Sequence, residues 1–272
     1  MALVTVAAVD YRFFRIAAAD VALVVDVIRR ANERDIEIRA SYWAGSEQGV
    51  ARSFTQAIPS TADLPPVDGV GPGVRCVGSA GEVSWDLTIS PGDRVVDARG
   101  GPLRHLRAFD LQLVSRPDAQ FNGWLKIGGI SREVDGHGLL CHYWGRRLPS
   151  RWFWVSANVP GLIVDASVMR SRLWNLPWPR VTVGYVFVSA GGRRAFHIGP
   201  LNSIVTAHGD ATKFTIAASR PGQRIELICQ PGHAAYNDLG GGILQTLHGD
   251  VSIDGWGATV GQAGVEVLNR PS

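Results

Sequence analysis

The sequence predicts an all-β protein, with two antiparallel barrel domains in tandem. Many short runs rich in Val, Ile and Leu are separated by turn residues, and the chain holds 32 Gly and 15 Pro but only 2 Met. Its 272 residues are 46% hydrophobic, enough for a large core. About ten evenly spaced strands in the second half are typical of a barrel, because closure leaves no strand edge unpaired.

The first clear element is a hairpin over residues 21–43. Two runs rich in β-branched residues flank a polar turn at residues 31–35, and the second run alternates apolar and polar side chains. A helix over residues 20–34 is the alternative, but the density of Val and Ile weakens it. Residues 58–73 hold four prolines and predict a loop that is long for a simple connection.

Strands resume at residue 74. We expect strands at residues 81–89 and 106–115, where the second run alternates Phe and Leu with Asp and Gln. A domain boundary is predicted at Arg116-Pro117-Asp118, because a new set of strands begins shortly after it. The N-terminal domain is then residues 1–117 and the C-terminal domain residues 118–272.

The C-terminal domain is predicted to consist of short strands separated by turn residues. These strands cover residues 123–128, 139–144, 152–158, 162–170, 181–189, 194–198, 203–208, 213–219, 224–230 and 245–253.

Composition excludes several classes of function. The net charge of +3 has both signs scattered, which gives no support for a nucleic-acid partner. The three Cys are widely spaced and predict neither a disulfide framework nor a zinc site. We expect them to be reduced thiols, as in a cytoplasmic protein. The seven His form no metal-binding motif, and the Gly run at residues 240–242 lacks the context of a nucleotide loop. Neither metal nor cofactor is expected. The apolar N-terminus is too short to span a membrane and lacks a basic leader region.

The chemistry-bearing residues follow strand periodicity in residues 137–174. Side chains two apart share a face of a strand, so one face carries Trp152, Trp154, Ser156 and Asn158. His142 and Trp144 share a face of the preceding predicted strand, and a turn at residues 145–151 would pair it with the next one. Asp165 and Ser167 share a face of the following strand. If the three strands are neighbours, Trp, His, Asn and Asp side chains converge.

HYWGRRLPSRWFWVSAN at residues 142–158 resembles the His-x-Trp-Gly and Trp-x-Trp signature of the lipocalin-like tocopherol cyclase, carotenoid hydratase and AttH-like family. EVSWDLTI at residues 82–89, which contains Trp85, is similar to a strand in that family's first domain. The resemblance implies two lipocalin-like barrels, a ligand cavity at or between them, and cofactor-free chemistry on isoprenoids or polyenes. Some relatives catalyse Diels–Alder cyclisations and others have no known activity, so it implies the fold more firmly than the reaction.

Isoprenoid chemistry that begins with protonation gives each residue a role. An alkene is a poor base, so its proton donor must be a carboxylic acid kept neutral by burial, and Asp165 is the candidate. The indoles of Trp144, Trp152 and Trp154 would stabilise the carbocation. His142 or Asn158 would orient a water in a hydratase, whereas a cyclase would use the substrate's own hydroxyl. We place Ser156 and Trp85 with the substrate-binding residues.

Each role has a structural alternative. The Trp residues could form barrel core, His142 could bond the backbone, Asp165 could face solvent, and Asn158 could belong to a turn. A Diels–Alderase would need only shape and hydrogen bonds to a carbonyl. A carrier would use the same cavity for a lipid without any reaction, and the position of Asp165 separates it from an enzyme.

The expected partner is a small hydrophobic molecule in a cytoplasmic protein. A concentration of basic and aromatic residues suggests a second contact, with an anionic membrane surface from which a lipid-like substrate is drawn. The same residues could form a solvated rim. They are Arg146, Arg147, Arg151, Arg170, Arg172, Arg180, Trp174 and Trp178. Oligomeric state, substrate length and a lid role for residues 59–73 have no signature in the sequence.

Overall fold

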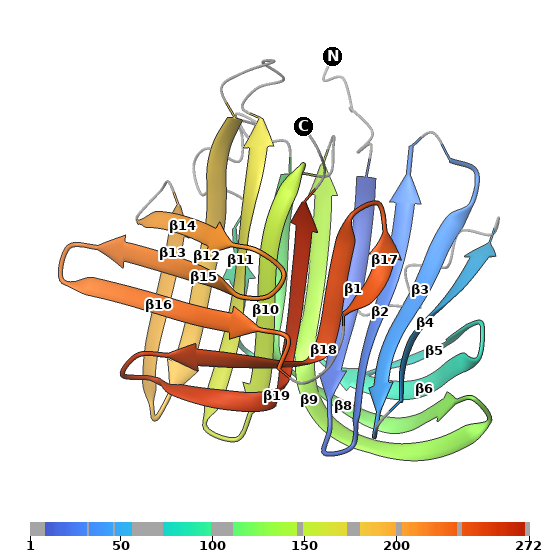
Figure 1. Ribbon diagram of the computed structural model, residues 1–272. Coiled ribbons are helices and arrows are strands. Elements are labelled where there is room, and N and C mark those ends of the chain that lie inside the picture. Colours follow the sequence, from blue (N-terminus) through green and yellow to red (C-terminus); the bar gives the residue numbers. More distant parts are fainter. Residues whose placement is uncertain are drawn as a thin grey trace.

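Every regular element in the described part of the chain is a β-strand (Figure 1), which confirms the all-β prediction. The computed structural model describes residues 9–31, 33–45, 47–55, 73–98, 111–145, 149–172, 180–199, 203–232 and 236–269. The strands of the first half are β1 (Val9–Ala17), β2 (Val21–Arg30), β3 (Ile36–Ala44), β4 (Glu47–Thr55), β5 (Val74–Ala80), β6 (Val83–Ser90), β7 (Val96–Asp97), β8 (Leu111–Ile127) and β9 (Ile130–Gly145). Those of the second half are β10 (Arg151–Val159), β11 (Leu162–Arg172), β12 (Arg180–Ala190), β13 (Arg193–Gly199), β14 (Ile204–Gly209), β15 (Phe214–Arg220), β16 (Gln223–Gln230), β17 (Asn237–Gly240), β18 (Ile243–Ile253) and β19 (Gly257–Asn269).

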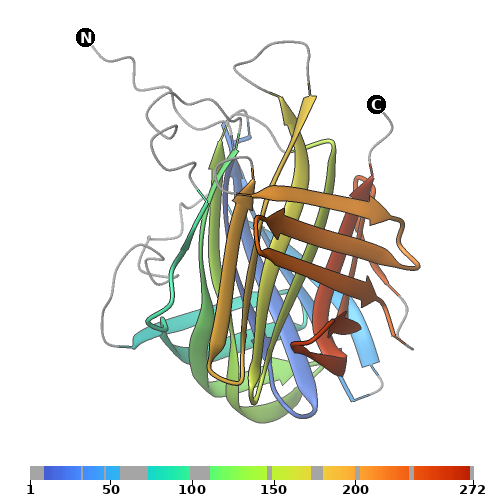
Figure 2. The same ribbon diagram turned by 90° about the vertical axis from the view of Figure 1, so that its left-hand side faces the viewer.

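The strands form two antiparallel sheets. The first has the order β4-β3-β2-β1-β9-β8-β6-β5, with β7 beside β8, and the second has the order β13-β12-β11-β10-β19-β18-β16-β15-β14, with β17 beside β18. The first sheet curls until its end strands meet, and the Tyr42 hydroxyl donates to Glu82 Oε1 (3.0 Å) across the seam. In the second sheet, β14–β16 cross the long strands β10 and β11 (Figure 2), and β14 contacts β12 and β13. Two tandem barrel-like sheets are therefore present, as predicted.

The hairpin predicted over residues 21–43 is confirmed. β2 and β3 pair in antiparallel register from Val21–Ala44 to Ile28–Glu37, so the helical alternative is wrong. Packing favours the strand over the helix, because side chains at alternate positions of β2 fill the barrel interior. In a helix about half of them would point away from it.

The domain boundary predicted at residues 117 and 118 falls inside a strand. β8 runs without a break from Leu111 to Ile127 and pairs with β9 along its length. Its register shifts between Arg116 and Ala119, which is a β-bulge that accommodates Pro117. The Arg-Pro-Asp sequence therefore marks a bulge rather than a linker, and the first sheet extends to Gly145.

The hairpin predicted between residues 142–144 and 152–158 is also wrong. β9 pairs with β1 and β8, whereas β10 pairs with β11 and β19. The chain leaves the first sheet at Gly145 and enters the second at Arg151, so this connection joins two sheets rather than two neighbouring strands.

Side-chain alternation divides the core into three layers. The interior of the first sheet is an apolar cluster that includes Phe14, Leu87 and Phe121, and the interior of the second includes Phe153, Phe214 and others. Burial of each large side chain contributes about 1.5–3 kcal/mol relative to an exposed position. The opposite faces of β1, β2 and β9 pack against the opposite faces of β10–β12, β18 and β19, and this third cluster joins the two sheets.

Several predictions concern parts of the chain for which the structure gives no description. Almost all of the loop at residues 58–73 lies outside the described residues, as do Arg146, Arg147, Trp174 and Trp178. Within the described residues, no helix is long and apolar enough to cross a membrane.

Candidate functional site

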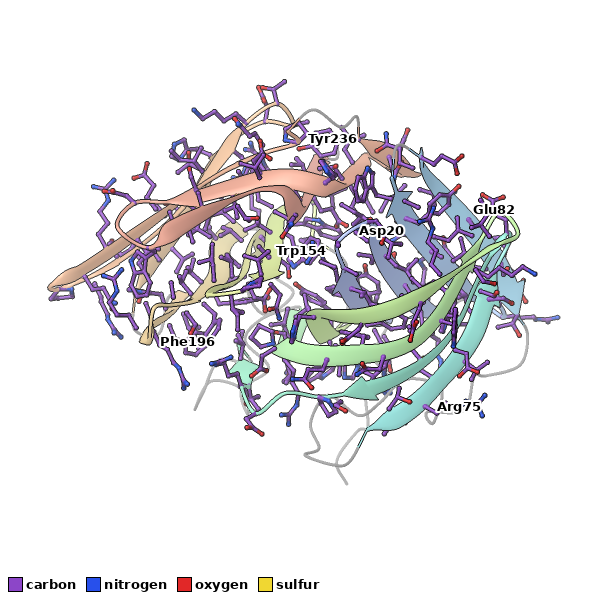
Figure 3. The ribbon with its side chains drawn as sticks, turned by 90° about the horizontal axis from the view of Figure 1, so that it is seen from below. Asp20, Arg75, Glu82, Trp154, Phe196 and Tyr236 are labelled. Atoms are coloured by element: carbon purple, nitrogen blue, oxygen red, sulfur yellow. The ribbon has the colours of Figure 1, made fainter. Side chains whose placement is uncertain are left out.

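The layer between the two sheets contains the candidate site. Figure 3 shows Trp154 between the strands of the first and second sheets. β10 places Trp152 and Trp154 on the face that looks toward the first sheet, while Phe153 and Val155 point into the second barrel. The period of two in a strand therefore gives β10 one face for barrel packing and one for the intersheet layer.

A small cavity lies in this layer. Five aromatic and three polar side chains form most of its wall, and the lining residues are Tyr11, Phe13, Val24, Tyr143, Trp152, Trp154, Ser167, Met169, Gln245 and Glu266. About 30 Å³ remains for the centres of water molecules, which is room for one or two waters. A substrate-sized ligand would have to displace aromatic side chains or separate the sheets locally.

Asp165 on β11 is completely buried beside this cavity. It accepts hydrogen bonds from the Ser115 and Tyr185 hydroxyls, the second at 3.0 Å. Burial raises the pKa of Asp165 to about 6, although both hydroxyls favour the charged form. The buried Trp154 indole N–H also favours that form but lacks hydrogen-bond geometry. The solvent-facing alternative for Asp165 is therefore wrong. The Tyr143 side chain interacts with Tyr185 and lines the cavity, which links the carboxyl to the free space.

Glu266 on β19 is a second buried carboxyl and lies in the cavity wall itself. The Trp152 indole N–H donates to Glu266 Oε1 (2.6 Å), and Gln245 Nε2 donates to Oε2 (2.7 Å). Burial, assisted by the negative charge of Asp26, raises the pKa of Glu266 to about 7. Both carboxyls can therefore exchange a proton near neutral pH.

A buried ion pair on the first sheet approaches Glu266 across the layer. Arg39 Nε donates to Asp26 Oδ2 (2.6 Å), and the Tyr11 hydroxyl donates to Asp26 Oδ1 (2.8 Å). Burial and the neighbouring carboxylates raise the pKa of Tyr11 well above its usual range, so its hydroxyl stays protonated. This pair neutralises most of its own charge and holds Tyr11 in the cavity wall.

Arg15 adds a buried cation at the edge of the same layer. Its side chain is fully buried, Nη2 donates to the Gln262 carbonyl (2.6 Å), and Nε and Nη1 have no partner among the described residues. Burial lowers the pKa of Arg15 to about 10. Gly264 makes room for it, since a Cβ there would lie 2.6 Å from Arg15 Nε and 3.1 Å from the Trp154 ring.

Four predicted residues and Asp165 lie together on the intersheet faces of β10 and β11. Trp152 and Trp154 line the cavity, and Ser156 is buried directly opposite Asp165 in the strand register. Asn158 Nδ2 donates to the carbonyls of Pro117 (2.8 Å) and Gly138 (3.3 Å). Asn158 thus binds the two sheets together rather than belonging to a turn.

His142 and Trp144 do not join this group, so the predicted convergence is wrong for them. They lie on the face of β9 that carries Leu140, whereas Cys141 and Tyr143 face the cavity side. His142 Nε2 is 3.1 Å from Asp10 Oδ1, and its ring lies 4.5 Å from the Trp144 ring. The cause is the missing hairpin: β9 belongs to the first sheet, and its even-numbered side chains point into that barrel.

Trp85 likewise lies away from the cavity. It packs in the interior of the first barrel, with its ring edge-on to Phe14 at 6.2 Å. Its predicted place among the substrate-binding residues does not fit this position, because the first sheet itself separates Trp85 from the cavity.

Sequence reasoning missed the residues contributed by β1 and β19. Tyr11 and Phe13 alternate on β1, and Glu266 alternates with Val265 and Val267 on β19. Both strands carry the alternation that would have predicted them. Tyr143 was adjacent to the predicted pair but on the other face of its strand.

The described residues offer few groups for a metal or for redox chemistry. Within them, no cluster of three or more His, Cys, Asp or Glu is placed to hold a metal ion. Cys76, Cys141 and Cys229 are buried and form no disulfide within the described residues, and burial raises the pKa of Cys141 well above its usual range.

Of the predicted group of basic and aromatic residues, Arg151 lies within the described part of the chain. The guanidinium of Arg151 donates to the Gly209 carbonyl (3.0 Å) and lies 5.0 Å from the centre of the Phe153 ring. This contact holds β10 near β14 and gives Arg151 a structural role. Contact with a membrane remains a prediction.

Comparison with known proteins supports the architecture. An AttH-like protein from Nitrosomonas europaea superposes with a TM-score of 0.66 at 14% identity, covering 97% of this chain and 93% of that one. The chain has the lipocalin-like two-barrel fold. Kievitone hydratase from Nectria haematococca gives a TM-score of 0.64 at 14% identity over 97% and 90% of the two chains. CghA in complex with Sch210972 gives 0.59 at 10% identity over 97% and 89%. No family model and no curated protein matches the sequence.

Proposed function

We propose that this protein is a cofactor-independent hydratase, cyclase or isomerase that acts on a hydrophobic isoprenoid or polyene between its two sheets. The observation that carries the proposal is Asp165. Its carboxyl is completely buried, its hydrogen-bond partners in the described part of the chain are hydroxyls rather than cations, and it lies beside an aromatic cavity. A carboxyl in such surroundings is readily protonated, as proton donation to an alkene requires.

The cavity wall suits the remainder of that chemistry. Protonation of an alkene carbon leaves a carbocation, and the rings of Trp152, Trp154 and Tyr143 surround the space in which it would form. Attraction between a cation and a desolvated indole face contributes about 2 kcal/mol. The proton would travel from Asp165 through the Tyr185 and Tyr143 hydroxyls, and water, a substrate hydroxyl or loss of a proton would then quench the cation.

The comparisons give this proposal a chemical context. One structural neighbour is named as a hydratase, and another is seen with a bound small molecule. A small hydrophobic ligand is therefore the partner that we propose, with contact at an anionic membrane surface as its delivery route.

Incubation with linear isoprenoids such as squalene, phytoene and lycopene in D₂O tests the proposal. Mass spectrometry should detect a product that carries deuterium on carbon. A hydratase product has gained the elements of water, whereas the product of a cyclase or isomerase has the composition of the substrate apart from the deuterium. Asp165→Asn should lower turnover about 100-fold or more. The matched control is Asp86→Asn, which changes an exposed carboxyl paired with Arg75.

Two other results would contradict it. A cyclised product without deuterium, formed equally by Asp165→Asn, indicates a pericyclase that works through shape and hydrogen bonds. An unchanged isoprenoid that co-purifies with the protein, with no turnover in any condition, indicates a carrier.

A further inference from the structure

We propose that Glu266 is a second catalytic residue of this cavity, the general base that accepts the proton released when the carbocation is quenched. The inference rests on the proposed function and deepens it. It assigns opposite tasks to the two buried carboxyls, with Asp165 as the acid and Glu266 as the base.

The hydrogen-bond partners of Glu266 match an ionised carboxylate. An indole N–H can only donate, so the bond from Trp152 requires an accepting oxygen at Oε1. The side-chain amide of Gln245 donates to Oε2, and its own Oε1 has no partner in the described structure. Both carboxylate oxygens therefore accept, and each keeps a lone pair that can take up a proton.

Asp165 has partners of a different kind. Ser115 and Tyr185 present hydroxyls, which can donate to a carboxylate or accept from a carboxylic acid after rotation of their hydrogens. The neutral acid therefore keeps its hydrogen bonds at Asp165, whereas protonation of Glu266 weakens the hydrogen bonds that Trp152 and Gln245 donate to it. This difference assigns the acid to the hydroxyl-lined position. The pKa of Asp165 (about 6) lies below that of Glu266 (about 7), so the productive pair of a protonated Asp165 and an ionised Glu266 is the less populated of the two singly protonated states.

The charged groups facing Glu266 leave it basic. Asp26 approaches from β2, Arg39 from β3 and the Tyr11 hydroxyl from β1. Arg39 is hydrogen-bonded to Asp26 rather than to Glu266, so among the described residues Glu266 has no direct salt bridge, and Arg39 lowers its pKa only from a distance. A carboxylate that is buried without a direct cationic partner is a stronger base than one in water.

The step balances for a hydration. Asp165 passes its proton through the Tyr185 and Tyr143 hydroxyls to an alkene carbon, and each hydroxyl regains a proton from the group before it. The π pair of the alkene forms the new C–H bond, which leaves a carbocation and the Asp165 carboxylate. The oxygen of a water molecule then forms the C–O bond while one of its O–H bonds breaks, and that proton moves to Glu266. Cyclisation differs only in that the substrate's hydroxyl replaces water. Proton exchange through solvent returns Asp165 to the acid and Glu266 to the carboxylate.

A cation that mimics the intermediate tests the role of Glu266 without a known substrate. The probes are a dimethylalkylamine, protonated at neutral pH, and the alcohol of the same chain length, with binding followed by calorimetry. Glu266→Gln keeps the size of the side chain and should weaken amine binding about tenfold, while alcohol binding changes little. Glu226→Gln, a half-exposed carboxyl on β16 that pairs with Arg224, is the matched control.

The outcomes separate the two proposals. If neither probe binds the unaltered protein, the cavity is not a ligand site and both proposals fail. If the alcohol binds and the amine binds equally to the unaltered protein and to Glu266→Gln, the role of Glu266 is wrong while the cavity stands. Melting temperatures of the variants establish that each is folded.

A second variant keeps the test decisive if Glu266→Gln does not fold. Trp152→Phe leaves the carboxylate but removes one N–H donor, which raises the pKa of Glu266. Amine binding should weaken as the pH falls and Glu266 is protonated, and in Trp152→Phe this loss should begin at higher pH. Identical pH profiles in the two proteins would overturn the assignment.

Discussion

The interior of the first barrel and the layer between the two sheets are built by the same strands but differ in polarity. On β1, Phe14 points into an apolar cluster, whereas Tyr11 and Arg15 point toward the second sheet. On β2, Val25 and Asp26 divide in the same way. The barrel interior is mainly apolar, and the polar residues on the barrel side of its strands include Asp10, His142 and Arg116. The intersheet layer collects buried charges, which lower stability unless they are paired or functional. We therefore place the chemistry between the barrels rather than inside one.

The largest expected effect comes from breaking the ion pair in the intersheet layer. Asp26→Asn leaves Arg39 buried without its counter-charge, and the free energy of unfolding should fall by about 3–5 kcal/mol. Replacing both members, with Asp26→Leu and Arg39→Met, should cost far less. Chemical denaturation of the three proteins measures this. Equal losses in the single and double variants would show that the layer depends on packing, like the barrel interior.

The pH dependence of stability is the next largest effect. The pKa of Asp165 is raised to about 6 and that of Glu266 to about 7. Between about pH 4 and these values the folded protein keeps both protons and the unfolded chain has lost them. Their contribution to stability is therefore complete at low pH and is lost as the pH rises, by at most about 3 kcal/mol for each group.

Denaturation curves across this pH range check the sign. Asp165→Asn and Glu266→Gln should each flatten the decline between about pH 4 and pH 7, because an amide does not titrate. A decline as steep in both variants as in the unaltered protein would mean that other groups produce it.

A matched pair of tryptophans compares the two regions directly. Trp85→Phe and Trp154→Phe each remove one ring from a buried position, and we expect each to lower the free energy of unfolding by about 1–2 kcal/mol. Only Trp154→Phe should also weaken binding of the amine probe, because Trp85 lies on the far side of the first sheet. A loss of amine binding in Trp85→Phe would place the ligand inside the first barrel.

The smallest expected effect is at His142. Its imidazole contacts Asp10 and the Trp144 ring on the barrel side of β9. His142→Ala should leave probe binding unchanged and alter stability by less than about 1 kcal/mol, as for a partly exposed pair. A clear loss of binding would restore His142 to the site and contradict the assignment of its face.

The local patterns in the sequence were enough to predict most of the strands and one wall of the candidate site. Alternation in residues 152–158 and 162–170 correctly placed Trp152, Trp154 and Asp165 on shared faces, because the period of two is a property of the strand itself. The antiparallel all-β character also followed from turn spacing and composition, whereas two barrels were expected from a boundary at residues 116–118 and from the family resemblance.

Strand pairing was decided only by the tertiary structure. The sequence around Pro117 fits either a linker or a β-bulge. Only the pairing with β9 on both sides of Pro117 shows that β8 continues through it. The same holds for His142, whose face depends on which sheet receives β9. Glu266 and Tyr11 lie in sequence about 250 residues apart, and only the packing of β19 against the first sheet brings them to one cavity. Periodicity along a strand is local and readable, whereas the neighbour that a strand face meets depends on contacts between distant segments.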